Sequence, residues 1–303
     1  MWSQLESALA SCFLDHPALL PVGLTALAPL VGAFLMGLDR KITARIQGRI
    51  GPPVSQPLYD VLKLMIKEPL FLNRVYIFYA WLHLAFMILA VVLLTTGQDI
   101  LMILFAHAFS TIALILGALS VRSPFSRVGA QRKIMQMVAY EPILILFVVG
   151  IYMSTPVPHS FLASAVMHLD RPLLLTLPLL FPAYFAAVII KLEKSPFDVS
   201  AGHHAHQELV RGVTLEYAGP FLAVIEITHF FEVFFIFTIM AMFWSTNLWI
   251  GAGLALGGFF AQIVIDNACA RLTTFWMVRF MWGGPMLLAL CNIIWIYGTG
   301  RGS

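Results

Sequence analysis

Eight long apolar segments alternate with polar connections along the chain. Their approximate ranges are 17–38, 75–96, 100–121, 134–154, 172–192, 218–243, 248–268 and 281–299. Each is close to the roughly 20 residues that a helix needs to cross the hydrocarbon core of a bilayer. Helices are also the spanning elements that satisfy their own backbone groups there. The pattern predicts an all-α integral membrane protein in which residues 1–303 form one polytopic domain with eight transmembrane helices.

Basic residues are concentrated in alternate connections. Sixteen of the 18 Lys and Arg residues, Lys133 and Lys191 among them, lie in or beside the first, third, fifth and seventh connections, and only Arg171 and Arg301 lie elsewhere. The positive-inside rule assigns loops of this kind to the cytoplasm. The sequence therefore predicts a multi-pass protein of the cytoplasmic membrane with both termini outside, as an even number of spans requires.

Composition narrows the class of protein. The chain is 60% hydrophobic and 11% charged, with a mean hydropathy of +0.89, which excludes an ordinary soluble domain. The net charge of +3 is segregated into loops, so a nucleic-acid-binding face is not expected. Cys12, Cys269 and Cys291 show no C-x-x-C spacing, which argues against a cluster or a zinc site. We predict that this chain holds no metal, no redox cofactor and no catalytic residue of its own.

Two connections carry structure or chemistry. Residues 55–68 place an apolar stripe opposite Asp60, Lys63 and Lys67, which favours an amphipathic helix in the membrane interface over a solvated loop. Residues 191–217 form an acidic and His-rich cytoplasmic loop, whose composition indicates proton handling or docking. Its acids are Glu193, Asp198, Glu208 and Glu216, and its histidines are His203, His204 and His206.

Ionisable residues also occur inside the predicted spans, where each costs about 2.5–3.5 kcal/mol on insertion scales. Glu226, His229 and Glu232 follow each other at intervals of three, so they share one helix face that rises roughly 9 Å. This stripe predicts a proton path, and Glu141, just before Pro142, is assigned to the same path. The alternative is that each acid pairs with Lys or Arg to tie helices together. For Asp266, close to Arg271, the two interpretations carry equal weight.

The histidines allow more than one interpretation. His203, His204 and His206 are spaced closely enough to ligate a metal. A catalytic zinc site would need a clearer third ligand and spacing, so a solvated or pH-sensitive cluster is favoured. His83 and His107 each stand alone in a span. Hydrogen bonds between helices are the expected role of both.

Several motifs, in order, resemble a known family. They are D-R-K-I-T-A-R-I-Q-G-R-I-G-P-P from Asp39, Q-P-L-Y-D-V-L-K-L-M-I-K-E from Gln56, A-Y-E ending at Glu141, P-F-D ending at Asp198, E-L-V from Glu208 and E-Y-A-G from Glu216. Together they resemble subunit 1 of respiratory NADH:quinone oxidoreductase, or complex I, with its eight-helix layout. The string H-H-A-H-Q-E, residues 203–208, is instead similar to membrane subunits of energy-converting [NiFe] hydrogenases of the Ech type, relatives of complex I and of formate hydrogenlyase.

The resemblance implies roles for matching residues. It places Glu141, Glu193, Asp198, Glu208 and Glu216 at a proton-handling junction between redox arm and membrane arm. It implies docking of hydrophilic subunits on the first connection, through Arg40, Lys41, Arg45, Arg49, Asp60 and Lys63. The implied partners are the NiFe-binding large subunit, the iron–sulfur small subunit, a ferredoxin-like subunit and an antiporter-like membrane subunit, and these partners would hold the iron–sulfur clusters and the NiFe centre.

The function expected on this basis is membrane anchoring and coupling in a complex I-like energy-converting hydrogenase. Electron transfer between ferredoxin and protons would drive translocation of protons or sodium ions. Subunit 1 of NADH:quinone oxidoreductase, which forms the quinone site, is one alternative. A stand-alone ion-coupled carrier and a purely structural anchor are the others.

Overall fold

The computed structural model describes residues 19–69, 71, 73–155, 159–167, 169, 171–197 and 212–299. Across these ranges the regular structure is helical, apart from an isolated bridge between Asp99 and Leu162. The helices are α2 (Leu19–Ile46), α3 (Gln56–Ile66), α4 (Arg74–Thr95), α5 (Ile100–Leu119), α6 (Pro124–Ser154), α7 (Ala163–Met167), α8 (Leu173–Thr176), α9 (Leu180–Lys191), the 3₁₀ turn η1 (Gly212–Thr214), α10 (Pro220–Met242), α11 (Leu248–Ala268), α12 (Thr274–Gly283) and α13 (Pro285–Gly298).

Seven segments of this described structure are long and apolar enough to cross a membrane. They are α2 from Pro21, α4, α5, α6, α10, α11 and the combined α12–α13, residues 274–298. The shorter apolar helix α9 stands where the remaining predicted span was placed. The all-α membrane fold predicted from the hydrophobic pattern is confirmed.

Local sequence sets where several helices begin. Asn73 and Asp99 cap α4 and α5, because their side chains accept hydrogen bonds from the backbone amides of Val75 and Leu101. Asn247 caps α11 in the same way. Proline occupies the first turn of α3, α6, α10 and α13, where its missing amide hydrogen costs nothing.

The fifth predicted span is not one continuous helix. It is divided into α8 and α9 around Pro178, which cannot donate a backbone hydrogen bond. Asn292 of α13 bridges the break: its Oδ1 accepts from the amides of Leu179 and Leu180, at 2.8 and 3.1 Å, and its Nδ2 donates to the carbonyl of Thr176 at 3.2 Å. A neighbouring side chain thus satisfies the freed backbone groups, as a broken helix in an apolar environment requires.

The eighth predicted span begins earlier than expected. The pattern placed it at 281–299, whereas the candidate span covers 274–298 and is interrupted at Gly284, directly before Pro285. Charged Arg279 lies in this segment, with its guanidinium 4.1 Å from the ring centre of Phe275. Arg279 interrupts the run of apolar residues, and for this reason the pattern predicted a span that begins only after it.

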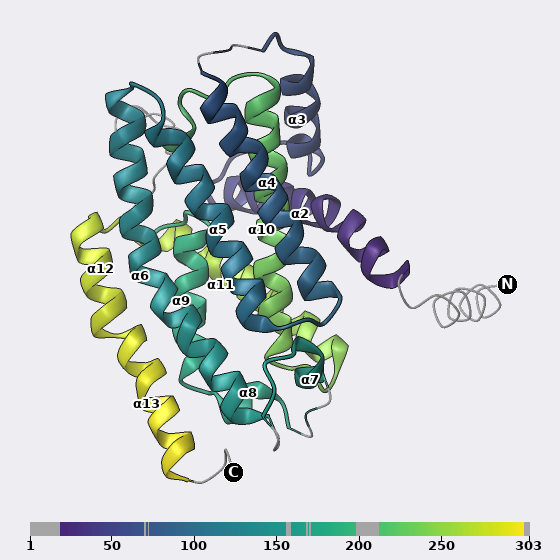
Figure 1. Cartoon of the computed structure of the whole chain (residues 1–303), viewed down its shortest axis with the longest axis vertical. Helices are drawn as coiled ribbons and strands as arrows, with labels where there is room; N and C mark the ends of the chain where they lie inside the picture. Colours follow the sequence, from purple (N-terminus) through teal and green to yellow (C-terminus); the bar gives the residue numbers. More distant parts are fainter. Residues whose placement is uncertain are drawn as a thin grey trace, which may run out of the picture.

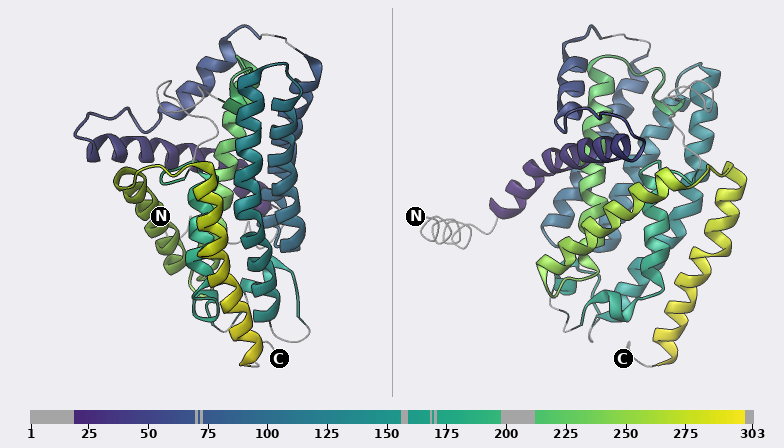
Figure 2. Two further views of the ribbon diagram at one scale, coloured as in Figure 1. Left: turned by 90° about the vertical axis from the view of Figure 1, so that its left-hand side faces the viewer. Right: turned by 180° about the vertical axis from the view of Figure 1, so that it is seen from behind.

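The helices form an upright bundle crossed by inclined helices. α4, α5, α6 and α10 run along the long axis of the molecule, whereas α2 and α11 cross it obliquely (Figures 1 and 2). In α5 and α10, 67% of the most apolar stretch is buried within the chain, compared with 22% in α2. α10 is therefore central, and it packs against α2, α3, α4 and α11.

Glycine allows α2 to cross α10 at close range. A Cβ atom at Gly32 would collide with the backbone carbonyl of Phe230 in α10. A Cβ atom at Gly37 would collide with the carbonyl of Val54, in the connection before α3. Because both contacts are with backbone, a side chain at either position would force the elements apart. The close crossing at Gly32 therefore places the middle of α2 against the middle of α10.

Candidate functional site

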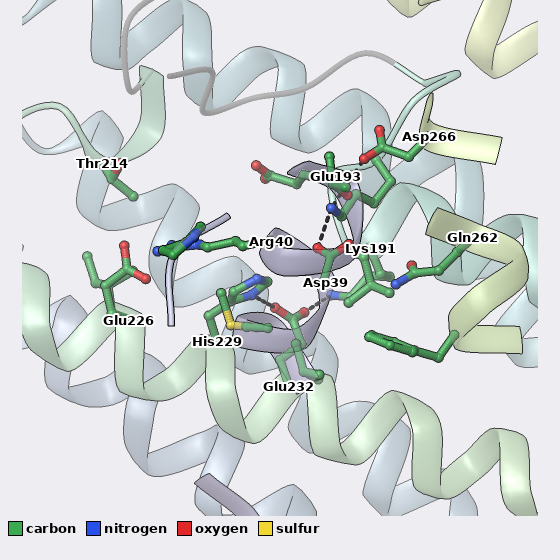
Figure 3. Close-up of a pocket in the computed structure, with 18 of the residues that line it drawn as sticks. Asp39, Arg40, Lys191, Glu193, Thr214, Glu226, His229, Glu232, Gln262 and Asp266 are labelled. Carbon is green, nitrogen blue, oxygen red and sulfur yellow. Dashed lines mark hydrogen bonds and ion pairs between the residues drawn. The ribbon is translucent and has the colours of Figure 1, made fainter. Parts of the chain in front are cut away.

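A cavity of about 700 Å³ lies where α2, α10, α11 and the segment after α9 meet. Its wall is unusually rich in ionisable side chains for a membrane domain, as the close-up in Figure 3 shows. The acids that line it are Asp39, Glu193, Glu226, Glu232 and Asp266, and the basic groups and histidines are Arg40, Arg49, Lys133, Lys191, Lys194, Arg271, His83 and His229.

Glu232 in the middle of α10 is the centre of this charge network. Its carboxylate lies 2.7 Å from the ammonium of Lys191, 3.3 Å from Nδ1 of His229 and 3.9 Å from Nε2 of His107. The side chain of Glu232 is 13% exposed and that of Lys191 is 3% exposed. Glu232 is therefore a largely buried carboxylate surrounded by three groups that can exchange protons or charge with it.

Lys191 is held by three helices. It ends α9 and donates to Glu232 of α10, to Oγ1 of Thr111 in α5 at 3.1 Å and to the hydroxyl of Tyr140 in α6 at 3.2 Å. An ammonium group has three protons to donate, and these three partners use all of them. Lys191 therefore joins the central helix to its neighbours through one buried charge.

Three further ion pairs, formed by two lysines, extend the network. Lys133 of α6 lies 2.6 Å from Glu193, which follows α9, and it is within electrostatic range of Glu232. Lys194 bridges Asp39 of α2, at 2.5 Å, and Asp266 of α11, at 3.3 Å. The charged groups of the cavity are thus coupled from one helix to the next.

Lys194 lies outside the spans, and its pKa follows from its partners. Burial lowers the pKa of its ammonium, but the carboxylates of Asp39 and Asp266 outweigh burial and hold the pKa above its usual range. The bridge is consequently intact at neutral pH. Its contribution to stability is lost as alkaline pH deprotonates Lys194.

The structure brings together part of the predicted proton path. Glu226, His229 and Glu232 line the same cavity from α10, as their spacing predicts, and Glu193 joins them from the segment after α9. In Figure 3, Glu232 lies between His229 and Lys191, with Glu226 farther along the helix. Their role in proton transfer is not tested by position alone and stays a prediction.

Other predicted residues of the path are not in the cavity wall. Glu141 lies in α6, and its buried Oε2 has no hydrogen-bond partner within the described ranges. Glu216 is half-buried between η1 and α10. The remaining members of this set, Asp198, Glu208 and the possible cluster of His203, His204 and His206, lie outside the residues that the structure describes.

The predicted docking residues divide into two groups. Arg40 forms a 2.9 Å ion pair with Asp60 of α3 and, with Arg49, lines the cavity. Arg49 is also exposed, as are Lys41, Arg45 and Lys63, but these last three do not line the cavity. The first connection therefore presents some of its charges inward to the cavity and others outward.

Four interpretations drawn from the pattern need correction or completion. Lys133 and Lys191, counted among the loop residues, are buried in helices and belong to the network. Asp266 is bonded to Lys194 and to the amide of Ser195, at 2.9 Å. His83 forms the predicted bond between helices, through Ser110 of α5, at 2.7 Å to the hydroxyl oxygen. His107 instead stacks on Phe235.

Sequence reasoning missed the cationic half of the site. It selected the acids inside the spans but treated the lysines as topology signals, although a lysine at the end of an apolar helix is as costly to bury as a glutamate. Lys191 falls within the predicted span 172–192, and that position was the available signal. Asp39 and Lys194 carried no such signal, because only folding brings them together.

Comparisons with known proteins agree with this architecture. The family model described as NADH dehydrogenase matches residues 20–297. The chain belongs to the NADH dehydrogenase family. It is 34% identical over 214 residues to a putative NADH-ubiquinone oxidoreductase of Methanocaldococcus jannaschii, a match that covers 68% of this chain and 70% of that protein. It is 28% identical to a subunit of the NADH-quinone oxidoreductase of Anoxybacillus flavithermus over 248 residues, 72% of each chain.

A solved structure shows the same fold. A chain of the membrane-bound sulfane sulfur reductase, an archaeal respiratory membrane complex, superposes with a TM-score of 0.80 at 24% sequence identity. The match covers 92% of this chain and 98% of that one. This protein is thus a multi-pass membrane protein of the NADH dehydrogenase family that shares its fold with that chain.

Proposed function

We propose that this chain is the coupling subunit of a complex I-like membrane complex, in which buried charges convert electron transfer in a hydrophilic partner into ion translocation. The observation that carries the proposal is the Lys191–Glu232–His229 network at the wall of the cavity. A buried ion pair adds little net stability, because removing both charges from water can cost as much free energy as their attraction returns. A functional role explains why several of them converge at one cavity.

The network can respond to charge at a distance. Each ion pair balances a carboxylate against a lysine, so a new negative charge at one end favours protonation of the next acid. Glu193 is paired with Lys133, and Lys133 is within electrostatic range of Glu232, which completes such a sequence from the segment after α9 into α10. Charge changes outside the membrane would thus bias proton uptake within it.

For the redox module we favour an energy-converting [NiFe] hydrogenase of the Ech type, fed by ferredoxin. The support is the H-H-A-H-Q-E string at residues 203–208, which is similar to that of hydrogenase membrane subunits. The second candidate is the quinone-site subunit of NADH:quinone oxidoreductase, which is favoured by the names of the curated relatives.

The coupling role is tested by Glu226→Gln and Glu232→Gln in the intact complex. Glu226 lines the cavity, and its amide variant keeps shape while removing the titratable group. We expect both variants to assemble and transfer electrons but to lose roughly tenfold or more in proton uptake by membrane vesicles. Asp99→Asn, whose amide still caps α5 beyond the cavity, is the control and should pump normally. Unchanged pumping in both glutamate variants would leave only an anchoring role.

The redox module is tested by purifying the complex through a tag on this chain. The hydrogenase proposal predicts stoichiometric nickel, iron–sulfur proteins and hydrogen evolution with reduced ferredoxin. Metal analysis, mass spectrometry of the subunits and gas chromatography provide the measurements. A complex that contains a flavin-binding NADH subunit and is inhibited by quinone-site blockers would reject the hydrogenase in favour of the second candidate. A chain that translocates ions alone in liposomes would reject both.

A further inference from the structure

His107 is a buried histidine that the charge network does not yet account for. It lies in α5, is 2% exposed, and stacks on Phe235 of α10 with ring centres 4.7 Å apart. Stacking fixes the plane of the imidazole ring, so its two nitrogens have defined and different surroundings. The ring is within electrostatic range of four titratable groups, namely Lys191, Glu232, His83 and Lys133.

One ring nitrogen faces the centre of the network. Nε2 lies 3.9 Å from Oε1 of Glu232, the same oxygen that accepts from Lys191 at 2.7 Å. This separation is too long for a hydrogen bond, so Glu232 is bonded to Lys191 and only adjacent to His107. A small rotation of the glutamate away from Lys191 brings its carboxyl group within hydrogen-bond distance of Nε2.

The other nitrogen is unsatisfied. Nδ1 of His107 is buried and has no hydrogen-bond partner among the residues described. Burying a polar atom without a hydrogen-bond partner is unfavourable, so such an atom requires an explanation, for example an ordered water or a functional role. His107 also lines a second, small cavity with Tyr184 and Lys191, where about 10 Å³ is open to the centre of a water molecule.

That space is about the size required for one water. The hydroxyl of Tyr184 donates to the carbonyl of Ile236 at 2.9 Å, which leaves its oxygen free to accept a hydrogen bond. The remaining walls are largely apolar, including Leu104, Ala187 and Ile239. Among the residues that line this space, His107, Tyr184 and Lys191 have polar side chains.

We propose that His107 carries protons from Glu232 deeper into the membrane domain. Protonated Glu232 gives its proton to Nε2, and the proton on Nδ1 leaves to the water of the small cavity. The ring ends neutral with its tautomer exchanged, and Glu232 returns as a carboxylate to Lys191. This inference rests on the proposed coupling function and adds a residue that lies beyond the large cavity.

The position of His107 along α5 bears on the direction of the proposed proton transfer. His107 is twelve residues from Leu119, where α5 ends near the basic connection, and seven from Ile100 at its other end. At 1.5 Å per residue these separations are roughly 18 and 10 Å. His107 therefore lies beyond the midpoint of α5, counted from the end near the basic connection.

The test compares His107→Gln and His107→Phe in membrane vesicles that contain the intact complex, driven by reduced ferredoxin. Hydrogen evolution, or quinone reduction if the complex has that activity, reports electron transfer, and quenching of a pH-sensitive acridine dye reports proton uptake. We expect electron transfer to persist while protons taken up per electron pair fall roughly tenfold or more in both variants. Phenylalanine keeps the stacking on Phe235, so normal coupling in His107→Phe would show a structural role and overturn the proposal.

Two additions make every result informative. Glu232→Gln is measured in parallel: if it pumps normally, the coupling function itself fails, whereas loss of pumping in Glu232→Gln with normal pumping in the His107 variants rejects His107 alone. If neither His107 variant assembles, Ala187→Val replaces them, because it fills the small cavity and leaves His107 in place. Loss of coupling in that variant supports the proposal, and unchanged coupling overturns it.

Discussion

Replacing Lys191 by methionine is expected to lower the free energy of unfolding by about 3–5 kcal/mol, the cost of removing one partner of a buried ion pair. Methionine keeps an unbranched side chain that is one atom shorter, but it leaves the carboxylate of Glu232 without its 2.7 Å partner. It also removes the donor to Thr111 and Tyr140. The effect is measured by heating the detergent-solubilised complex and recording the temperature at which the co-purifying subunits are lost.

A matched pair of variants isolates the cause. Lys67→Met replaces an exposed lysine directly after α3 and should change stability by less than about 0.5 kcal/mol. The double variant Lys191→Met with Glu232→Gln removes both charges and should recover much of the loss, because no uncompensated charge remains buried. If Lys191→Met is as stable as Lys67→Met, Lys191 does not compensate Glu232 in the folded protein.

Replacing Lys194 by methionine is expected to cost about 3 kcal/mol, toward the lower end of the range for broken buried pairs because its side chain is 21% exposed. The ammonium lies between Asp39 and Asp266, so its removal leaves two carboxylates facing each other from α2 and α11. Lys67→Met, at an exposed position directly after α3, is the control and should be near neutral.

The pH dependence of this second variant has a definite sign. In the unmodified protein the raised pKa of Lys194 keeps the bridge complete below the unfolded pKa of a lysine, and stability is lost as alkaline pH rises through the folded value. In Lys194→Met this alkaline loss should disappear, because the group that titrates has been removed. Unfolding temperatures measured from pH 8 to pH 11 test this, and a variant whose stability falls with alkaline pH as steeply as that of the unmodified protein would contradict the assignment.

The membrane fold could be predicted from the chain alone because apolar length is a local property. The spans around 75–96, 100–121, 218–243 and 248–268 correspond closely to α4, α5, α10 and α11. The amphipathic stripe at 55–68 corresponds to α3. The break within 172–192 was not predicted, because the group that stabilises it, Asn292, lies more than 110 residues farther along the chain.

The candidate site was predictable in part for the same reason. Glu226, His229 and Glu232 share a face by helical spacing, and that spacing is a property of one segment. Their partners come from other helices. The separation of residues along the chain does not indicate which lysine contacts Glu232. Lys191 and His107 were identified as its neighbours only from the three-dimensional arrangement of α5, α9 and α10.

By itself, the amino-acid sequence determined that this is a helical membrane protein with acids placed inside its spans, because burial of apolar length and the spacing of side chains along one helix depend on neighbours in the chain. Tertiary structure alone decided which charges are paired, where the cavity lies, and that a histidine stands beside Glu232. The reason is physical: an ion pair or a cavity is a relation between surfaces of different helices, and only their packing brings those surfaces together.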